Sequence, residues 1–74
     1  MESRIELHPD ICNGRPVIRG TRVSVQAILE FLGAGDTIDD LLGAYPHLSR
    51  EDILAALRYS SRLMAHRYRI EQVA

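Results

Sequence analysis

The stretch LGAYPHLSRED, residues 42–52, decides how this chain folds, because it places a proline between two segments with helical periodicity. Pro46 disfavours a helical conformation at Tyr45 and so ends the first of these helices. Ser49 and Asp52 have the spacing of a capping box, in which each side chain accepts a hydrogen bond from the other residue's backbone N–H. The stretch therefore predicts a corner between two helices. A corner of this kind also suits a DNA-binding helix-turn-helix, or a small polar site around His47.

Three amphipathic helices are predicted from residue 24 onward, each with an N-terminal capping residue: Ser24, Thr37 and Ser49. Apolar residues follow each cap at helical spacing and form one stripe per helix. The stripes are Val25, Ile28, Leu29 and Leu32 in the first helix, Ile38, Leu41, Leu42 and Tyr45 in the second, and Ile53, Leu54, Leu57, Met64 and Tyr68 in the third. Gly33 and Gly35 are expected to end the first helix.

The segment before residue 24 is rich in β-branched residues and turn formers, which favours short strands. Asn13-Gly14 is a dipeptide that accepts positive φ in a tight hairpin turn. The predicted fold is therefore mainly α, a three-helix, helix-turn-helix-like domain with a short N-terminal β-hairpin. A single domain is expected over residues 1–74, with a β-rich element at 1–23, a three-helix cluster at 24–69 and a tail at 70–74.

A chain of 74 residues buries a modest share of its surface, so a partner or a second copy would stabilise it, and a homo-oligomer is expected. Its one cysteine, Cys12, cannot form an internal disulfide, which suits the cytoplasm. No apolar run is long enough for a membrane span.

Neither catalysis nor metal binding is indicated by the sequence. His8, His47 and His66 have no acid, base or nucleophile at a recognisable spacing, and His8 with Cys12 supplies too few ligands for a metal. The glycines of residues 14–22 lack the spacing of a phosphate-binding loop. We expect no enzyme activity and no cofactor.

All nine basic residues are arginine, which favours bidentate contacts to carboxylates or phosphates. Residues 58, 62 and 69 share the outer face of the third helix, and three more arginines lie in the loop before the first helix. The candidate DNA- or partner-binding residues are Arg15, Arg19, Arg22, Arg58, Arg62 and Arg69. A solvated charged face remains an alternative to either contact. The third helix begins with Arg50, Glu51 and Asp52, and these acids disfavour its N-terminus as a base-reading element.

The chain resembles the domain of unknown function 433 family in an NGRP turn, a GTR segment, a GD step and the run YP-x-L-x-x-x-D-I-x-A-A-L-x-Y. The match extends over about two-thirds of the chain, and its linked motifs make it specific. Arg15 stands where many relatives have lysine. The structural motif residues are Gly20, Thr21, Tyr45, Pro46, Ser49 and Asp52. In the GTR segment, Gly20 is expected to allow close backbone approach and Thr21 to satisfy free backbone groups.

This resemblance implies a helix-turn-helix-like fold and, for many members, the antitoxin role of a type II toxin–antitoxin pair. Such an antitoxin would neutralise a PIN-like ribonuclease toxin encoded beside it, and would regulate its own promoter by binding DNA. Two alternatives remain: a stand-alone DNA-binding regulator, and a small dimerising scaffold.

Overall fold

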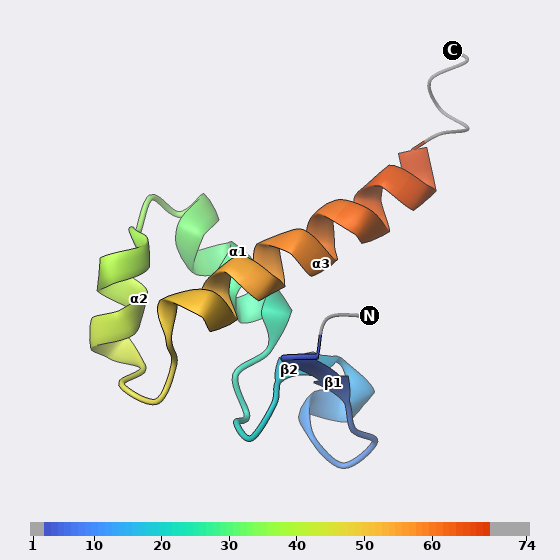
Figure 1. Ribbon diagram of the computed structural model, residues 1–74, viewed down its shortest axis with the longest axis horizontal. Helices are drawn as coiled ribbons and strands as arrows, with labels where there is room; N and C mark the ends of the chain where they lie inside the picture. Colours follow the sequence, from blue (N-terminus) through green and yellow to red (C-terminus); the bar gives the residue numbers. More distant parts are fainter. Residues whose placement is uncertain (1–2, 69–74) are drawn as a thin grey trace.

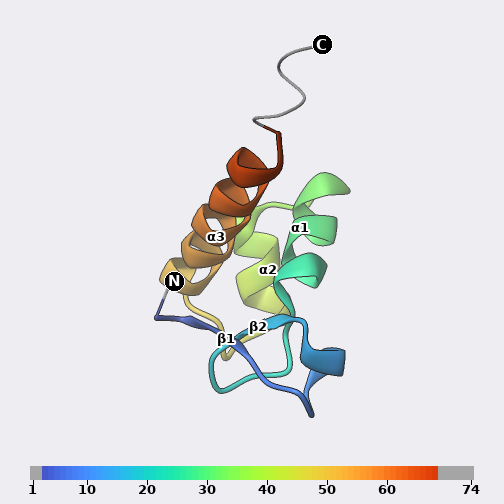
Figure 2. The ribbon, with the colours of Figure 1, turned by 90° about the vertical axis from the view of Figure 1, so that its right-hand side faces the viewer.

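The computed structural model describes residues 3–68, and the side chains of residues 3–65. Within these residues the fold is mainly α, as predicted, with three α-helices and one two-stranded antiparallel sheet (Figure 1). The elements in chain order are β1 (Ile5–Leu7), the 3-10 helix η1 (Cys12–Gly14), β2 (Pro16–Ile18), α1 (Val25–Gly33), α2 (Ile38–Ala44) and α3 (Arg50–Tyr68). Figure 2 shows the strands beneath one end of the helical layer, with α1 and α3 side by side above them.

The sheet pairs Ile5 with Ile18, Glu6 with Val17 and Leu7 with Pro16. Residues 8–15 connect the strands, so the tight two-residue turn predicted at Asn13-Gly14 is wrong. The expected positive φ is present, at 57° in Asn13 and 78° in Gly14, and Cys12 adopts 50° as well. These three consecutive residues with left-handed backbone conformations form η1. The connection between the strands that contains η1 is longer than a two-residue hairpin turn.

All three helices begin at the predicted caps. The Ser24 hydroxyl accepts a hydrogen bond from the Ala27 N–H at 3.0 Å. Thr37 with Asp40 forms a reciprocal capping box (3.1 and 2.8 Å), as Ser49 does with Asp52 (3.2 and 2.9 Å). These bonds satisfy backbone donors that a helix start would leave unpaired.

The first two helices end in different ways. At the end of α1 the Gly35 N–H donates to the Leu32 carbonyl and the Asp36 N–H to the Phe31 carbonyl, with φ of 103° at Gly35. This is a Schellman motif, which requires a left-handed residue at that position. The last residue of α2 is Ala44, and Tyr45 packs edge-on against Phe31 with ring centroids 5.8 Å apart.

The core lies where the sheet, α1, α2 and the first half of α3 meet. Its buried members come from every element except η1 and from the α2–α3 connection: Ile5, Val17, Ile18, Val25, Ile28, Leu41, Leu48, Ile53, Ala55 and Ala56. Ala55 and Ala56 are both fully buried, because the first half of α3 contacts the sheet on one side and helices on the other. Small side chains permit this approach on two sides.

The second half of α3 extends past the core, as Figure 1 shows at its upper right. The helix has 19 residues and is therefore about 28 Å long. The prediction that Met64 belongs to the core face is wrong, since its exposed fraction is 46%. Ile53 is buried as predicted, and Leu54 and Leu57 are half-buried. Apolar residues therefore continue at helical spacing along α3 beyond the part of the helix that packs against the core.

Candidate functional site

An apolar groove of about 340 Å³ lies between α1 and the second half of α3. Its walls include Arg15, Val25, Leu29, Tyr59, Leu63 and Met64. Three of these side chains are large, apolar and substantially exposed: Leu29 at 37%, Leu63 at 47% and Met64 at 46%. Concave, mostly apolar surfaces of this kind are typical of binding sites. The groove was missed from the sequence, because α1 and α3 had to be placed together before it could be seen.

One rim of the groove is polar. The Arg15 guanidinium donates to the Gln26 side-chain oxygen at 3.2 Å, and the Gln26 amide donates to the Glu30 carboxylate at 3.3 Å. These contacts hold a cation and an anion on the exposed side of α1. Arg15 and Gln26 line the groove, whereas Glu30 lines a second hollow with Phe31 and Ala34.

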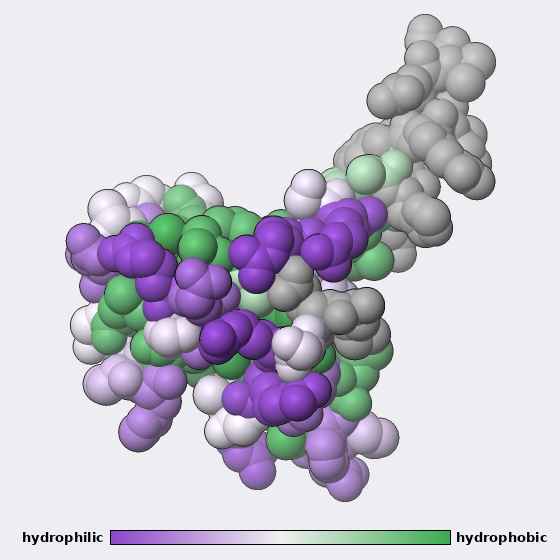
Figure 3. All heavy atoms as spheres, viewed as in Figure 1, coloured by the Kyte–Doolittle hydropathy of each residue, from purple (hydrophilic) through white to green (hydrophobic). Residues whose placement is uncertain are grey.

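The opposite face of α3 is basic. Arg58 and Arg62 are exposed there, one turn apart. Helical geometry places them roughly 100–160° around the helix axis from Leu63 and Met64. Figure 3 shows hydrophilic residues along α3 on one side of the molecule. Arg69, the third member of the predicted set, lies outside the described residues.

The loop arginines do not join this basic face as one surface. Arg15 lies at the groove, on the other side of α3. The Arg19 guanidinium lies 3.7 Å from the Glu6 carboxylate, and both residues belong to the β1–β2 region. Arg22 is exposed, and its backbone carbonyl accepts a hydrogen bond from the Cys12 thiol at 3.3 Å. The basic face of α3 is therefore separate from the loop arginines, of which Arg15 lies at the groove and Arg19 beside Glu6.

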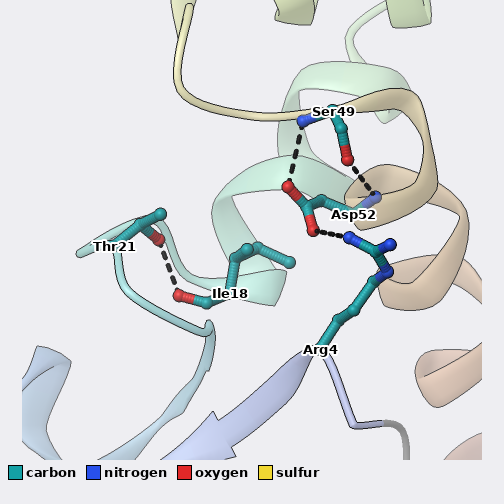
Figure 4. A network of polar contacts seen from close by, with 5 residues as sticks. All are labelled: Arg4, Ile18, Thr21, Ser49 and Asp52. Atoms are coloured by element: carbon teal, nitrogen blue, oxygen red, sulfur yellow. Dashed lines mark hydrogen bonds and ion pairs between the residues drawn. The ribbon is translucent and has the colours of Figure 1, made fainter.

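The GTR segment stabilises the loop that leads into α1. The Thr21 hydroxyl donates to the Ile18 carbonyl at 2.8 Å (Figure 4). It also accepts from the Val23 N–H at 3.0 Å, so it satisfies two backbone groups, as expected. Gly20 has a φ of 78°, a conformation that favours glycine. A Cβ atom at Gly20 would meet no atom within 4 Å, so close backbone approach is not the role of this glycine.

The N-terminus of α3 is occupied by contacts within the chain. The Asp52 carboxylate accepts from the Ser49 N–H and from the Arg4 guanidinium, the latter at 2.9 Å (Figure 4). The Arg50 guanidinium contacts the Asp39 carboxylate at 2.6 Å. Glu51 is exposed. Because this helix start presents a carboxylate and uses its arginine internally, it is poorly suited to reading DNA bases.

The pKa values of two capping carboxylates are lowered. Partial burial tends to raise the pKa of Asp52, but the hydrogen bonds from the Ser49 backbone and the Arg4 guanidinium outweigh it, so the pKa lies below its ordinary value. The pKa of Asp40 is lowered by the Thr37 N–H first and by the Thr37 hydroxyl second. Both aspartates therefore remain charged in mildly acidic solution.

The histidines and acidic residues form no recognisable metal site in the described part of the chain, where no three His, Cys, Asp or Glu side chains gather. The His8 ring accepts a weak contact from the Asp10 N–H at 3.4 Å, and His47 is exposed at the corner before α3. The side chain of His66 lies outside the described residues. No helix among residues 3–68 is long and apolar enough to cross a membrane.

Comparisons with known proteins identify a family for this chain and a solved structure with a similar fold. A family model described as "Protein of unknown function (DUF433)" matches residues 5–60. A crystal structure of a member of that family from Anabaena variabilis superposes with a TM-score of 0.79 and 33% identity, covering 82% of this chain and 60% of that one. The uncharacterized protein y4eO of Sinorhizobium fredii is 42% identical over 52 residues, which are 70% of this chain and 24% of that protein. This chain therefore spans about a quarter of the length of that relative.

Proposed function

Because the chain belongs to the DUF433 family, whose function is unknown, we propose a specific role for it: the antitoxin of a type II toxin–antitoxin pair. In this role the chain is not an enzyme. It acts in the cytoplasm by binding and neutralising a PIN-like ribonuclease toxin. The observation that carries the proposal is the exposed pair Arg58 and Arg62 on one face of α3, of which Arg62 lies on the part of the helix that extends past the core.

The chemistry of the toxin explains why this pair matters. A ribonuclease that binds metal through clustered carboxylates has an acidic active site. Arginine suits such a site, because its planar guanidinium can donate two parallel hydrogen bonds to one carboxylate. The second half of α3 lies clear of the sheet and α2, so it can reach into a cleft that the whole domain could not enter (Figure 1). Occupation of the acidic site by arginine would exclude metal and RNA.

We expect the double variant Arg58→Ala/Arg62→Ala to bind the toxin at least tenfold more weakly, a change of about 1.4 kcal/mol. The chain is co-expressed with the protein encoded by the adjacent reading frame, and the complex is purified and examined by size-exclusion chromatography with light scattering. Neutralisation is scored as the loss of ribonuclease activity in the purified complex.

Arg50→Ala provides the matched control, because it removes another exposed α3 arginine at the opposite end of the helix. The control should bind and neutralise like the wild type. If the neighbouring protein does not bind the wild type at all, the antitoxin proposal fails. If both variants neutralise equally well, the toxin contacts a different surface.

DNA binding is the second candidate function, favoured by the same exposed face and by the order of α2, a five-residue connection and α3. Because the polar side chains at the start of α3 make contacts within the chain, we expect this protein to contact DNA phosphates rather than base edges. Binding to the chain's own upstream DNA should weaken steeply with salt. Loss of Arg58 and Arg62 should reduce the slope of log K against log salt by about 1.8, at about 0.9 per phosphate contact. Fluorescence anisotropy over a salt series measures this slope, and an unchanged slope would remove this face from DNA binding.

A further inference from the structure

Two residues that line the groove between α1 and α3 are also large apolar side chains that remain exposed to solvent. Leu63 and Met64 line the groove and remain about half exposed. The second half of α3 therefore forms part of a groove and also carries exposed apolar side chains that could occupy the same groove in another molecule. A surface with both features can pair with a second copy of itself across a twofold axis.

The charge pattern of the second half of α3 fits this pairing. The residues that face the groove there are uncharged: Tyr59, Ser60, Leu63 and Met64. Arg58 and Arg62 lie on the opposite face, so two paired copies would keep these arginines apart and facing outward. Among the described residues that line the groove, the charged one is Arg15, whose guanidinium donates to the Gln26 side-chain oxygen at 3.2 Å.

We infer that this groove is a homodimer interface, in which Leu63 and Met64 of each copy insert against Leu29 and Tyr59 of the other. The groove alone is small beside the roughly 800 Å² per partner of a standard interface. The second halves of both α3 helices must therefore contribute, and the dimer dissociates on dilution. The inference does not depend on a toxin, since the basic face remains open in either state.

Two of the residues in this interface lie beyond the family match. The family model ends at residue 60, close to where α3 leaves the core. Leu63 and Met64 follow that end, so the interface combines a groove wall inside the family domain with side chains outside it. A second copy is favoured over a foreign helix because the complementary side chains belong to the chain itself.

Sedimentation velocity on the full chain alone, from about 1 μM to about 1 mM, covers the range in which small interfaces dissociate. The wild type should pass from monomer to dimer. Leu63→Glu and Leu29→Glu should each weaken dimerisation at least tenfold, because each would bury an unpaired carboxylate. Both positions are partly exposed, so these variants should fold, and circular dichroism verifies this. Ala65→Glu is the control, since it adds the same charge to an exposed α3 position on the opposite face.

A mixing experiment tests the contact between the two leucine positions directly. Leu63→Glu mixed with Leu29→Lys should form a heterodimer, because one of its two contacts joins opposite charges and the other is unaltered. The mixture should therefore dimerise more strongly than either variant alone. A wild type that stays monomeric throughout overturns the inference, as does a dimer that Leu63→Glu and Leu29→Glu leave unchanged. Failure of the mixture to exceed its components would refute the pairing of these two positions.

Discussion

Replacement of Ile28 with alanine is expected to lower the free energy of unfolding by about 2–5 kcal/mol. Ile28 is fully buried on the inner face of α1, and truncation removes apolar contacts and leaves a cavity in the core. A domain of this size is stable by only about 4–11 kcal/mol, so much of its stability is lost. Urea denaturation followed by circular dichroism measures the change as a shift in midpoint.

The adjacent residue gives a matched control for this prediction. Leu29 follows Ile28 in α1 but is 37% exposed and lines the groove. Leu29→Ala should cost the monomer less than about 1 kcal/mol when measured at a concentration below that of dimerisation. Equal losses at the two positions would contradict the placement of the core on one side of α1.

Replacement of Asp52 with alanine is expected to cost about 2–3 kcal/mol, because one carboxylate makes several charge-assisted contacts. Its side chain is only 13% exposed, accepts from the Ser49 N–H, and pairs with Arg4. The change leaves a backbone donor and a guanidinium without this partner. Thermal and urea denaturation of Asp52→Ala, Arg4→Ala and the double variant form a cycle that isolates the coupling of the pair.

The pH dependence of this effect has a definite sign. The pKa of Asp52 is lower in the folded chain than in the unfolded chain, where an aspartate has a pKa of about 4. Its contribution is therefore complete above that pH and is lost as the pH falls through the folded pKa. The stability difference between the wild type and Asp52→Ala should narrow in acid. Asp40→Ala, which removes the exposed capping carboxylate of α2, should destabilise less because Asp40 has no arginine partner among its described contacts.

The helix starts could be predicted from the sequence because their causes are local. Ser24, Thr37 and Ser49 each bond to a backbone group three residues away, so short segments contain the whole interaction. The partner of Asp52 was not foreseen, since Arg4 lies 48 residues earlier in the chain. The burial of Ala55 and Ala56 was also missed, because the apolar period marks large side chains and not the small ones that permit close packing.

The candidate site could be predicted only in its charged part. Arg58 and Arg62 follow helical spacing, so their common exposed face could be derived from residue numbers alone. The groove depends on α1 lying beside α3 and on the point where the core ends. Met64 continues the apolar stripe of α3 in sequence, yet it lies where few neighbours remain in space. Periodicity predicts which way a side chain points but does not predict what lies opposite.

The contact between β1 and α3 determines when the core can form during synthesis of the chain. β1 is synthesised before α3, against which it packs. Arg4 cannot pair with Asp52 until the intervening residues have been synthesised, and closure of so long a loop carries an entropic cost. The early hairpin is too small to be stable in isolation. The nascent chain can therefore complete this core only once α3 has been synthesised.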